Sequence, residues 1–280
     1  MRNFLFTFLF ASFLLFTSTV KAQYIEVGGM VGGTSYYGDL QKTKPELGSF
    51  GSTVSVMARS NRSSRYAFRA AAMYGSFNAT DGRNSGSLRL RNLETQTSLY
   101  ELSVCAEYNL IPYDIIDGQT HTPYLFLGVG GLYFNPQGRY QGKFIDLRPL
   151  GTEGQFLTGT KTYSPFQVVI PMGFGFKMAL KKRLSVGFEF GIRQTFTDYL
   201  DDISTTYPNL DALSKINTIA AEMSYKTPLL AGQSAAIEGV TRGDKNKNDR
   251  YYSLGVTMTY SLASPQKMEY DNLYRQFINF

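Results

Sequence analysis

Four stretches of the chain place an apolar residue at every second position for about ten positions, the length that a tilted strand needs to cross a hydrocarbon layer. Successive side chains of a β-strand point to opposite faces, so each stretch predicts a strand with one apolar face and one face of small or polar residues. The apolar faces consist of Tyr100, Leu102, Val104, Ala106, Tyr108 and Leu110; Ile170, Met172, Phe174, Phe176, Met178 and Leu180; Leu184, Val186, Phe188, Phe190 and Ile192; and Tyr252, Leu254, Val256, Met258, Tyr260 and Leu262.

Four weaker stretches complete the predicted sheet, at residues 24–37, 51–60, 66–77 and 122–134. The last of them is apolar on both faces, so its orientation stays open. The total of eight strands is an even number, as a closed antiparallel barrel requires when both chain ends lie on the same side.

The connections between these strands alternate in length. The short ones cover residues 61–65, 111–121 and 181–183, and the long ones cover 38–48, 78–94, 135–164 and 198–249. Short periplasmic turns, long extracellular loops and tyrosines near both ends of a strand are typical of bacterial outer-membrane barrels. We therefore predict an all-β fold, an eight-stranded antiparallel transmembrane β-barrel of the outer-membrane type with long extracellular loops.

Two other folds fit the sequence less well. After the N-terminal segment, no run of about 18 apolar residues could form a transmembrane helix. A soluble lipocalin-like barrel would turn its apolar face inward and carry charges outside, whereas the second face here is mainly Gly, Ser and Thr. The mean hydropathy of −0.19 does not argue against a membrane protein, because alternating faces cancel in any average.

Both chain ends are predicted to lie outside the barrel, which covers residues 23–263. Residues 1–22 resemble an export signal, with Arg2, an apolar run and a cleavage site near Ala22. Residues 264–280 form a periplasmic tail. The tail places Leu273, Phe277 and Phe280 at helical spacing, which fits either a short docking helix or a poorly ordered terminus.

The net charge of the mature chain is small. The formal value of +6 includes Arg2 and Lys21, which leave with the signal, so +4 remains. This excess is too small to predict a nucleic-acid partner.

The face opposite the apolar stripes carries charges that would point into the barrel. They are Glu26, Arg59, Arg69, Glu101, Glu107, Lys177, Glu189 and Arg193, with as many acids as bases. The interior of an eight-stranded barrel is only wide enough for side chains to fill, and buried charges persist only when they are paired. We therefore predict a salt-bridged lumen and not a diffusion pore.

No catalytic, cofactor or metal site is predicted. The single histidine, His121, falls in a periplasmic turn, far from where a lipid-modifying barrel enzyme would need its base. Asp198, Asp201 and Asp202 fit a calcium site or, more simply, a solvated or Arg-paired acidic loop. A calcium loop starting at Asp244 would need Glu at its twelfth position, which is glycine. The lone Cys105 is interpreted as a small residue that fills the lumen.

Several strings resemble the PorG-like outer-membrane barrels of the type IX secretion system. They are the residues at 26–29 and 35–40, YELS at 100–103, GLYFNP at 131–136, LRPLGTEGQ at 147–155 and RQTFTDYLDDIS at 193–204. The last two are the most specific, and their loop residues Arg148, Glu153, Asp198, Tyr199, Asp201 and Asp202 are the candidate site residues that the resemblance provides.

The resemblance implies a component of the type IX protein secretion system that associates with the periplasmic PorK–PorN ring and ties it to the outer membrane. Lys181, Lys182 and Arg183 form a candidate contact for such a partner, although a solvated hairpin tip explains them as well. The alternative function is that of a small OmpA/OmpX-like barrel whose long extracellular loops bind ligands or surfaces.

Overall fold

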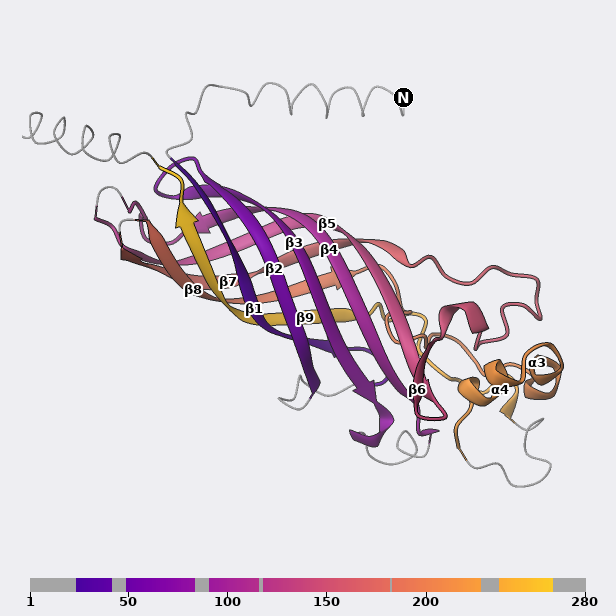
Figure 1. Ribbon diagram of the computed structural model, residues 1–280. Coiled ribbons are helices and arrows are strands. Elements are labelled where there is room, and N and C mark those ends of the chain that lie inside the picture. Colours follow the sequence, from indigo (N-terminus) through magenta and orange to yellow (C-terminus); the bar gives the residue numbers. More distant parts are fainter. Residues whose placement is uncertain are drawn as a thin grey trace, which may run out of the picture.

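The structure, a computed structural model, describes residues 24–41, 49–83, 91–115, 118–181, 183–227 and 237–263. Its body is a closed antiparallel barrel of eight strands, to which one short further strand is attached (Figure 1). The eight are β1 (Tyr24–Tyr37), β2 (Phe50–Asn61), β3 (Tyr66–Thr80), β4 (Glu94–Asn109), β5 (His121–Tyr140), β7 (Phe166–Lys181), β8 (Leu184–Thr195) and β9 (Arg250–Ser261). The ring closes between β1 and β9, where Glu26 lies opposite Ser261 and Tyr37 opposite Arg250. The predicted fold class is confirmed.

The strand boundaries differ from the prediction mainly at the loop end, the end of the barrel where the long connections begin. β4 starts at Glu94, before the apolar stretch that begins at Tyr100, and β5 continues to Tyr140, so the loop predicted from Asn135 begins too early. The chain then folds back on β5 as a hairpin through β6 (Lys143–Asp146). These strands continue beyond the apolar band, where apolar alternation is no longer needed, and the sequence pattern therefore does not show them.

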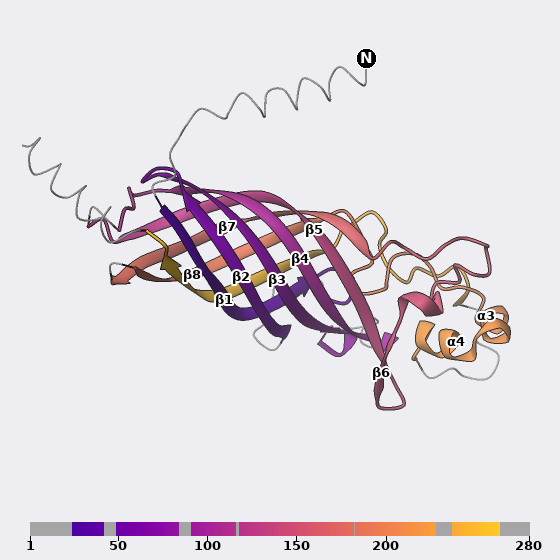
Figure 2. The ribbon, with the colours of Figure 1, turned by 45° about the horizontal axis from the view of Figure 1, so that its top comes forward.

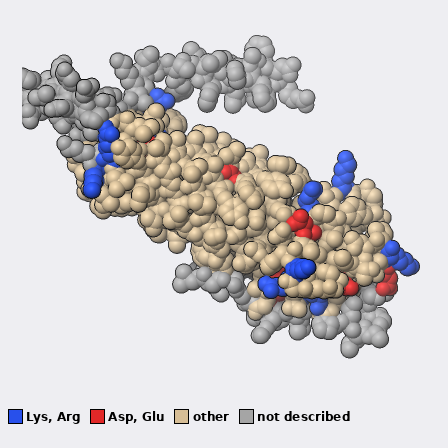
Figure 3. Space-filling model, in the orientation of Figure 1, with Lys and Arg blue, Asp and Glu red and all other residues tan. Residues whose placement is uncertain are grey.

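The outer surface of the barrel is an apolar band between two tyrosine girdles. Leu102, midway along β4, is 69% exposed. The ring centres of Tyr66 and Tyr108 lie 5.2 Å apart at the turn end, which is the end of the short connections. Those of Tyr74 and Tyr100 lie 5.1 Å apart toward the loop end. Charged side chains gather toward the two ends of the face shown in Figure 3. Such a surface is stable in lipid and not in water.

Strand β5 is apolar on both faces because its two faces have different partners. Leu125 and Leu127 point outward and are 49% and 58% exposed, whereas Tyr124 and Phe126 point into the lumen. The Arg69 guanidinium lies 4.8 Å from the centre of the Phe126 ring, within the range of a cation–π contact. The orientation that the sequence left open is therefore set by aromatic rings packed on lumen cations.

The connection between β8 and β9 contains two short helices, α3 (Leu210–Ile216) and α4 (Thr218–Ser224). They lie beyond the loop end of the barrel (Figures 1 and 2). A Cβ atom at Gly138 would overlap Met223 Cε, so a glycine in β5 allows α4 to pack there. Two single-turn helices, η2 (Asp81–Arg83) and η3 (Arg148–Leu150), lie in the connections that follow β3 and β6. No helix in these residues is long and apolar enough to span a membrane.

Three predictions concern residues outside the described part of the chain. They are the export signal at 1–22, the tail at 264–280 and the contribution of Lys182 to a basic turn. They remain predictions.

Candidate functional site

All eight predicted lumen residues lie inside the barrel, each at most 5% exposed. Glu107 is the centre of their network. Its carboxylate lies 2.8 Å from Arg59 Nε, 3.3 Å from Lys177 Nζ and 3.4 Å from Arg69 Nη1. Arg59 and Arg69 are direct cross-strand neighbours, so Glu107 offsets the repulsion between two like charges.

The other lumen acids complete this charge balance. Glu26 binds Arg59 at 2.7 Å, and Glu189 binds Arg69 through both carboxylate oxygens. Arg193 and Glu101 form a separate pair at 3.2 Å. The lumen is therefore filled by paired side chains from strands whose register is fixed, as the period-two pattern requires.

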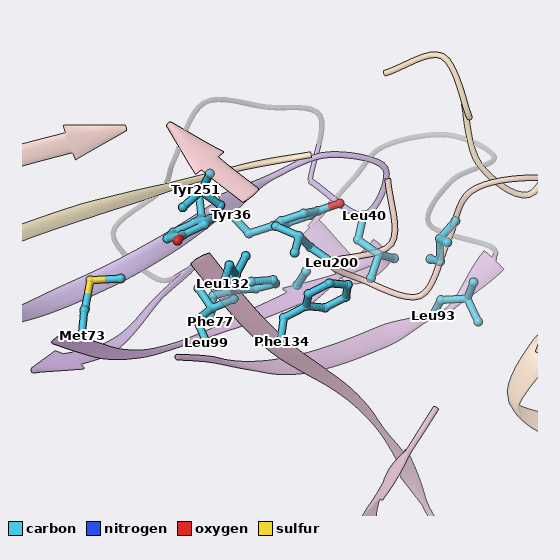
Figure 4. Close-up of a cluster of buried hydrophobic side chains, with 13 residues drawn as sticks. Tyr36, Leu40, Met73, Phe77, Leu93, Leu99, Leu132, Phe134, Leu200 and Tyr251 are labelled. Carbon is cyan, nitrogen blue, oxygen red and sulfur yellow. The ribbon is translucent and has the colours of Figure 1, made fainter. Parts of the chain in front are cut away.

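The loop end of the barrel is closed by residues 198–203, which we call the mouth segment. Leu200 is fully buried and packs with Tyr36, Leu40 and Phe134 in a cluster of apolar residues at the end of the barrel (Figure 4). The Thr97 hydroxyl of β4 donates to the Leu200 carbonyl at 2.7 Å. The mouth segment therefore acts as a plug that is held both by packing and by the barrel wall.

A network around Glu153 holds the outer side of the mouth segment. Glu153 Oε1 accepts the Ser204 N–H at 2.8 Å and lies 2.9 Å from Arg242 Nη1. Tyr199 donates to Glu153 Oε2 at 3.3 Å. Three distant segments, 147–155, 198–205 and the residues before β9, are thereby joined.

Asp202 belongs to the same network. Its carboxylate accepts hydrogen bonds from Thr152 at 2.5 Å and Tyr163 at 2.7 Å, and it lies 4.0 Å from Arg242 Nη2. Burial raises the pKa of Asp202 to about 6 although Arg242 opposes the rise. Arg148 lies beside this network, 3.4 Å from the Tyr163 carbonyl oxygen.

Asp201 and Asp198 lie on the inner side of the mouth segment. Asp201 Oδ2 and Asp249 Oδ1 lie 2.7 and 2.9 Å from the hydroxyl oxygen of Tyr36. Neither carboxylate oxygen of Asp198 makes a hydrogen bond of good geometry, and the residue is 6% exposed. Burial raises the pKa of Asp198 to about 8, and the neighbouring carboxylate of Asp201 adds to the rise.

In the described part of the mouth, buried acids outnumber buried bases. Among the residues that the structure describes there, seven carboxyl side chains and two guanidinium groups are buried: Asp39, Asp81, Glu153, Asp198, Asp201, Asp202 and Asp249 against Arg91 and Arg242. No three or more His, Cys, Asp or Glu side chains of the described chain are placed to hold a metal ion. The calcium interpretation is thus unsupported, and the Arg-paired alternative describes Asp202.

Sequence reasoning missed four contributors to the mouth: Tyr36, Arg91, Arg242 and Asp249. Arg91 holds both carboxylate oxygens of Asp81 at 2.7 Å from within a predicted loop. Tyr36 lies in one of the resemblance strings, Asp249 lies in the stretch from Asp244 that failed as a calcium loop, and Arg242 lies just before that stretch. Their appearance in otherwise unexplained polar segments was the available signal.

The remaining predicted positions lie apart from the mouth. Lys181 is exposed and Arg183 is half-buried at the turn end, where Arg183 Nη1 lies 3.1 Å from the Tyr260 hydroxyl. His121 is exposed at the first residue of β5, and Cys105 is buried in the lumen.

The closed ring, the apolar band with its girdles and the charge-paired lumen define an outer-membrane β-barrel protein. Residues 3–225 match a family described as a domain of unknown function, DUF6089, and the chain belongs to that family.

Several solved structures are similar to this chain. Neisserial surface protein A shares 10% identity at a TM-score of 0.42, with 84% of this chain and 96% of that chain covered. Ail, the attachment invasion locus protein of Yersinia pestis, shares 6% at 0.40, covering 85% and 97%. A major outer membrane protein from Thermus thermophilus shares 12% at 0.41, covering 85% and 99%. No curated protein matches the chain.

Proposed function

We propose that this barrel is a structural component of the type IX secretion system, which holds periplasmic ring proteins of the PorK and PorN kind at the outer membrane. The proposal starts from the resemblance strings. The segments 35–40, 147–155 and 193–204 lie far apart in the sequence and meet in the mouth, where residues of each contact the others or a shared partner.

The closed state of the barrel is the observation that carries the proposal. The lumen is filled by paired charges, and Leu200 plugs the mouth. A barrel that is filled and capped cannot serve as a general diffusion channel. A role as a membrane anchor for other proteins requires no open lumen.

The turn end supplies charge for a periplasmic partner. Arg65 and Lys181 are exposed there, and Arg183 is half-buried. The chemistry that fits these groups is an acidic protein surface, which would bind more weakly as salt increases. Export with signal cleavage near Ala22 is part of the same proposal and predicts a mature N-terminus at Gln23.

The test is a deletion strain assayed for secretion of cargo, together with mild detergent extraction of the tagged barrel. The deletion strain should lose secretion of cargo. The tagged barrel should co-purify with the ring proteins. A variant with Arg65, Lys181 and Arg183 changed to Gln should lose the ring proteins, whereas one with Lys143, Lys245 and Lys247 changed to Gln at the loop end should keep them. A barrel that purifies alone from a strain with intact secretion would contradict the proposal.

A second function is favoured by the loop end, where apolar side chains are exposed. At the loop end, the exposed fractions of Phe156, Ile216 and Val240 are 47%, 58% and 50%. Such groups could bind a ligand or surface outside the cell. Changing all three to Ser should then abolish that binding and leave secretion intact, whereas under the first function secretion depends on the turn end.

A further inference from the structure

Three side chains at the mouth, Tyr36, Asp201 and Asp249, contain one proton too few if both carboxyl groups are ionised. The Tyr36 hydroxyl oxygen lies within hydrogen-bond distance of both carboxylates, at 2.7 and 2.9 Å. A phenol hydroxyl group has one hydrogen and donates it to one acceptor. All three side chains are fully buried, so the second oxygen–oxygen contact needs a hydrogen from elsewhere.

The backbone hydrogen bonds show which carboxyl group carries that hydrogen. Asp201 accepts the Ile203 N–H on Oδ1 at 3.0 Å and the Leu40 N–H on Oδ2 at 3.2 Å. Both its oxygens already face donors. Asp249 accepts the Leu200 N–H on Oδ2 at 2.9 Å. Its Oδ1 faces only the Tyr36 hydroxyl among the hydrogen bonds of the described chain, which leaves this oxygen able to carry a proton.

The charges around the three residues agree with this assignment. Asp249 faces Tyr36, which lies in β1, and it faces Asp198 and Asp201, which lie in the mouth segment. Asp201 faces Asp39 and also Arg91, a cation already held by Asp81. Burial raises the pKa of Asp249, and the adjacent Asp201 and Asp198 raise it further.

We propose that Asp249 holds a proton on Oδ1 and donates it to Tyr36, which donates its own hydrogen to Asp201, and that this carboxyl latch keeps the mouth closed. When the latch proton leaves for solvent, two carboxylates face one phenol that can donate to only one of them, and the two buried negative charges repel each other. The mouth segment is then released, so that closure is linked to one proton.

The two aspartates offer a matched pair of variants in the full-length protein, folded in detergent micelles or nanodiscs. Asp249→Asn places an N–H where the proton sits and keeps an oxygen for Leu200, so it should fix the latch in its closed form. Asp201→Asn places an N–H against backbone donors and should weaken closure at every pH. The C=O stretching band of a protonated carboxyl group, measured by infrared spectroscopy, reports the proton directly.

Hydrogen exchange at Leu200 and Ile203, with labelling times corrected for the intrinsic effect of pH, reports closure. In the wild type, protection should fall by up to about tenfold per pH unit while the infrared band disappears, because one proton is released. In Asp249→Asn the pH dependence that this proton causes should vanish together with its band.

Three outcomes would overturn the latch. The first is a wild-type protein without a protonated-carboxyl band under acidic conditions where the mouth is closed. The second is a band unchanged in Asp249→Asn. The third is protection that depends on calcium or on a chelator, which would mean that a cation and not a proton balances the mouth.

Discussion

The lumen and the mouth of this barrel bury charge in two different ways. In the lumen, four acids and four bases lie on strands in fixed register, and salt bridges pair them. Among the residues that the structure describes at the mouth, buried acids exceed buried bases, and backbone N–H groups and hydroxyls from loops supply many of the hydrogen bonds. Salt bridges between carboxylates and guanidinium groups change little near neutral pH, whereas buried carboxyl groups that no cation faces change their protonation there.

The largest effect is expected at the centre of the lumen. Glu107→Gln leaves Arg59, Arg69 and Lys177 without their shared acid, and removing one partner of a buried ion pair costs about 3–5 kcal/mol. The free energy of unfolding, measured by urea titration in micelles, should fall by that amount. Asp146→Asn on the exposed β6 is the control, with a change within about 0.5 kcal/mol. Equal losses in both variants would show that the lumen network does not determine stability.

A second change tests the packing of the mouth. A Cβ atom at Gly38 would overlap both the Tyr36 hydroxyl and Asp249 Oδ1. Gly38→Ala should therefore destabilise the mouth segment by about 1–3 kcal/mol, as overpacking does, without opening the strands. Local hydrogen exchange measures this. Gly131→Ala, where a Cβ atom meets nothing within 4 Å, should leave exchange unchanged.

The contrast between the two regions also predicts a pH effect. Burial raises the pKa of Asp198 to about 8. The protonated carboxyl group therefore favours closure fully below its pKa in the unfolded chain, about 4, and this contribution is lost as pH rises through about 8. Protection of the mouth segment should be higher at acidic than at alkaline pH, while the strands stay protected throughout. Asp198→Asn should reduce this slope. An equal slope in strands and mouth would show that the two regions do not differ in their response to pH.

The smallest effect concerns the aromatic lining of the lumen. Phe126→Leu keeps an apolar side chain but removes the ring beneath Arg69, which should lower the free energy of unfolding by about 1–2 kcal/mol. The outward Leu127→Val is the control. If the two variants unfold alike, the aromatic residues on the inner face of β5 have no special role.

The barrel wall could be predicted because a strand has a period of two. Once one face of β4 or β7 is apolar, the side of every other residue follows, and residues such as Glu107 and Lys177 are assigned to the lumen. The pattern is less informative for β5, because Tyr124 and Phe126 pack on cations and look like lipid-facing residues.

The mouth could be predicted only in part. Loops have no repeating geometry, so sequence spacing cannot place Asp249 next to Tyr36 or Arg242 next to Glu153. The resemblance strings selected Glu153, Tyr199, Asp201 and Asp202, which do lie there, but not the arginines that hold the loops together. Those contacts arise from tertiary folding of segments that are far apart in the chain.

The pairing of the first strand with the last sets a condition on biogenesis. β1 is joined to β9 over residues 26–37 and 250–261, so the cylinder cannot be sealed until the C-terminal strand has arrived. Until then β1 and β8 each present an unpaired edge, which invites misassembly with other chains. A polypeptide truncated before Arg250 would therefore be expected to aggregate or be degraded during export, however complete the rest of its wall.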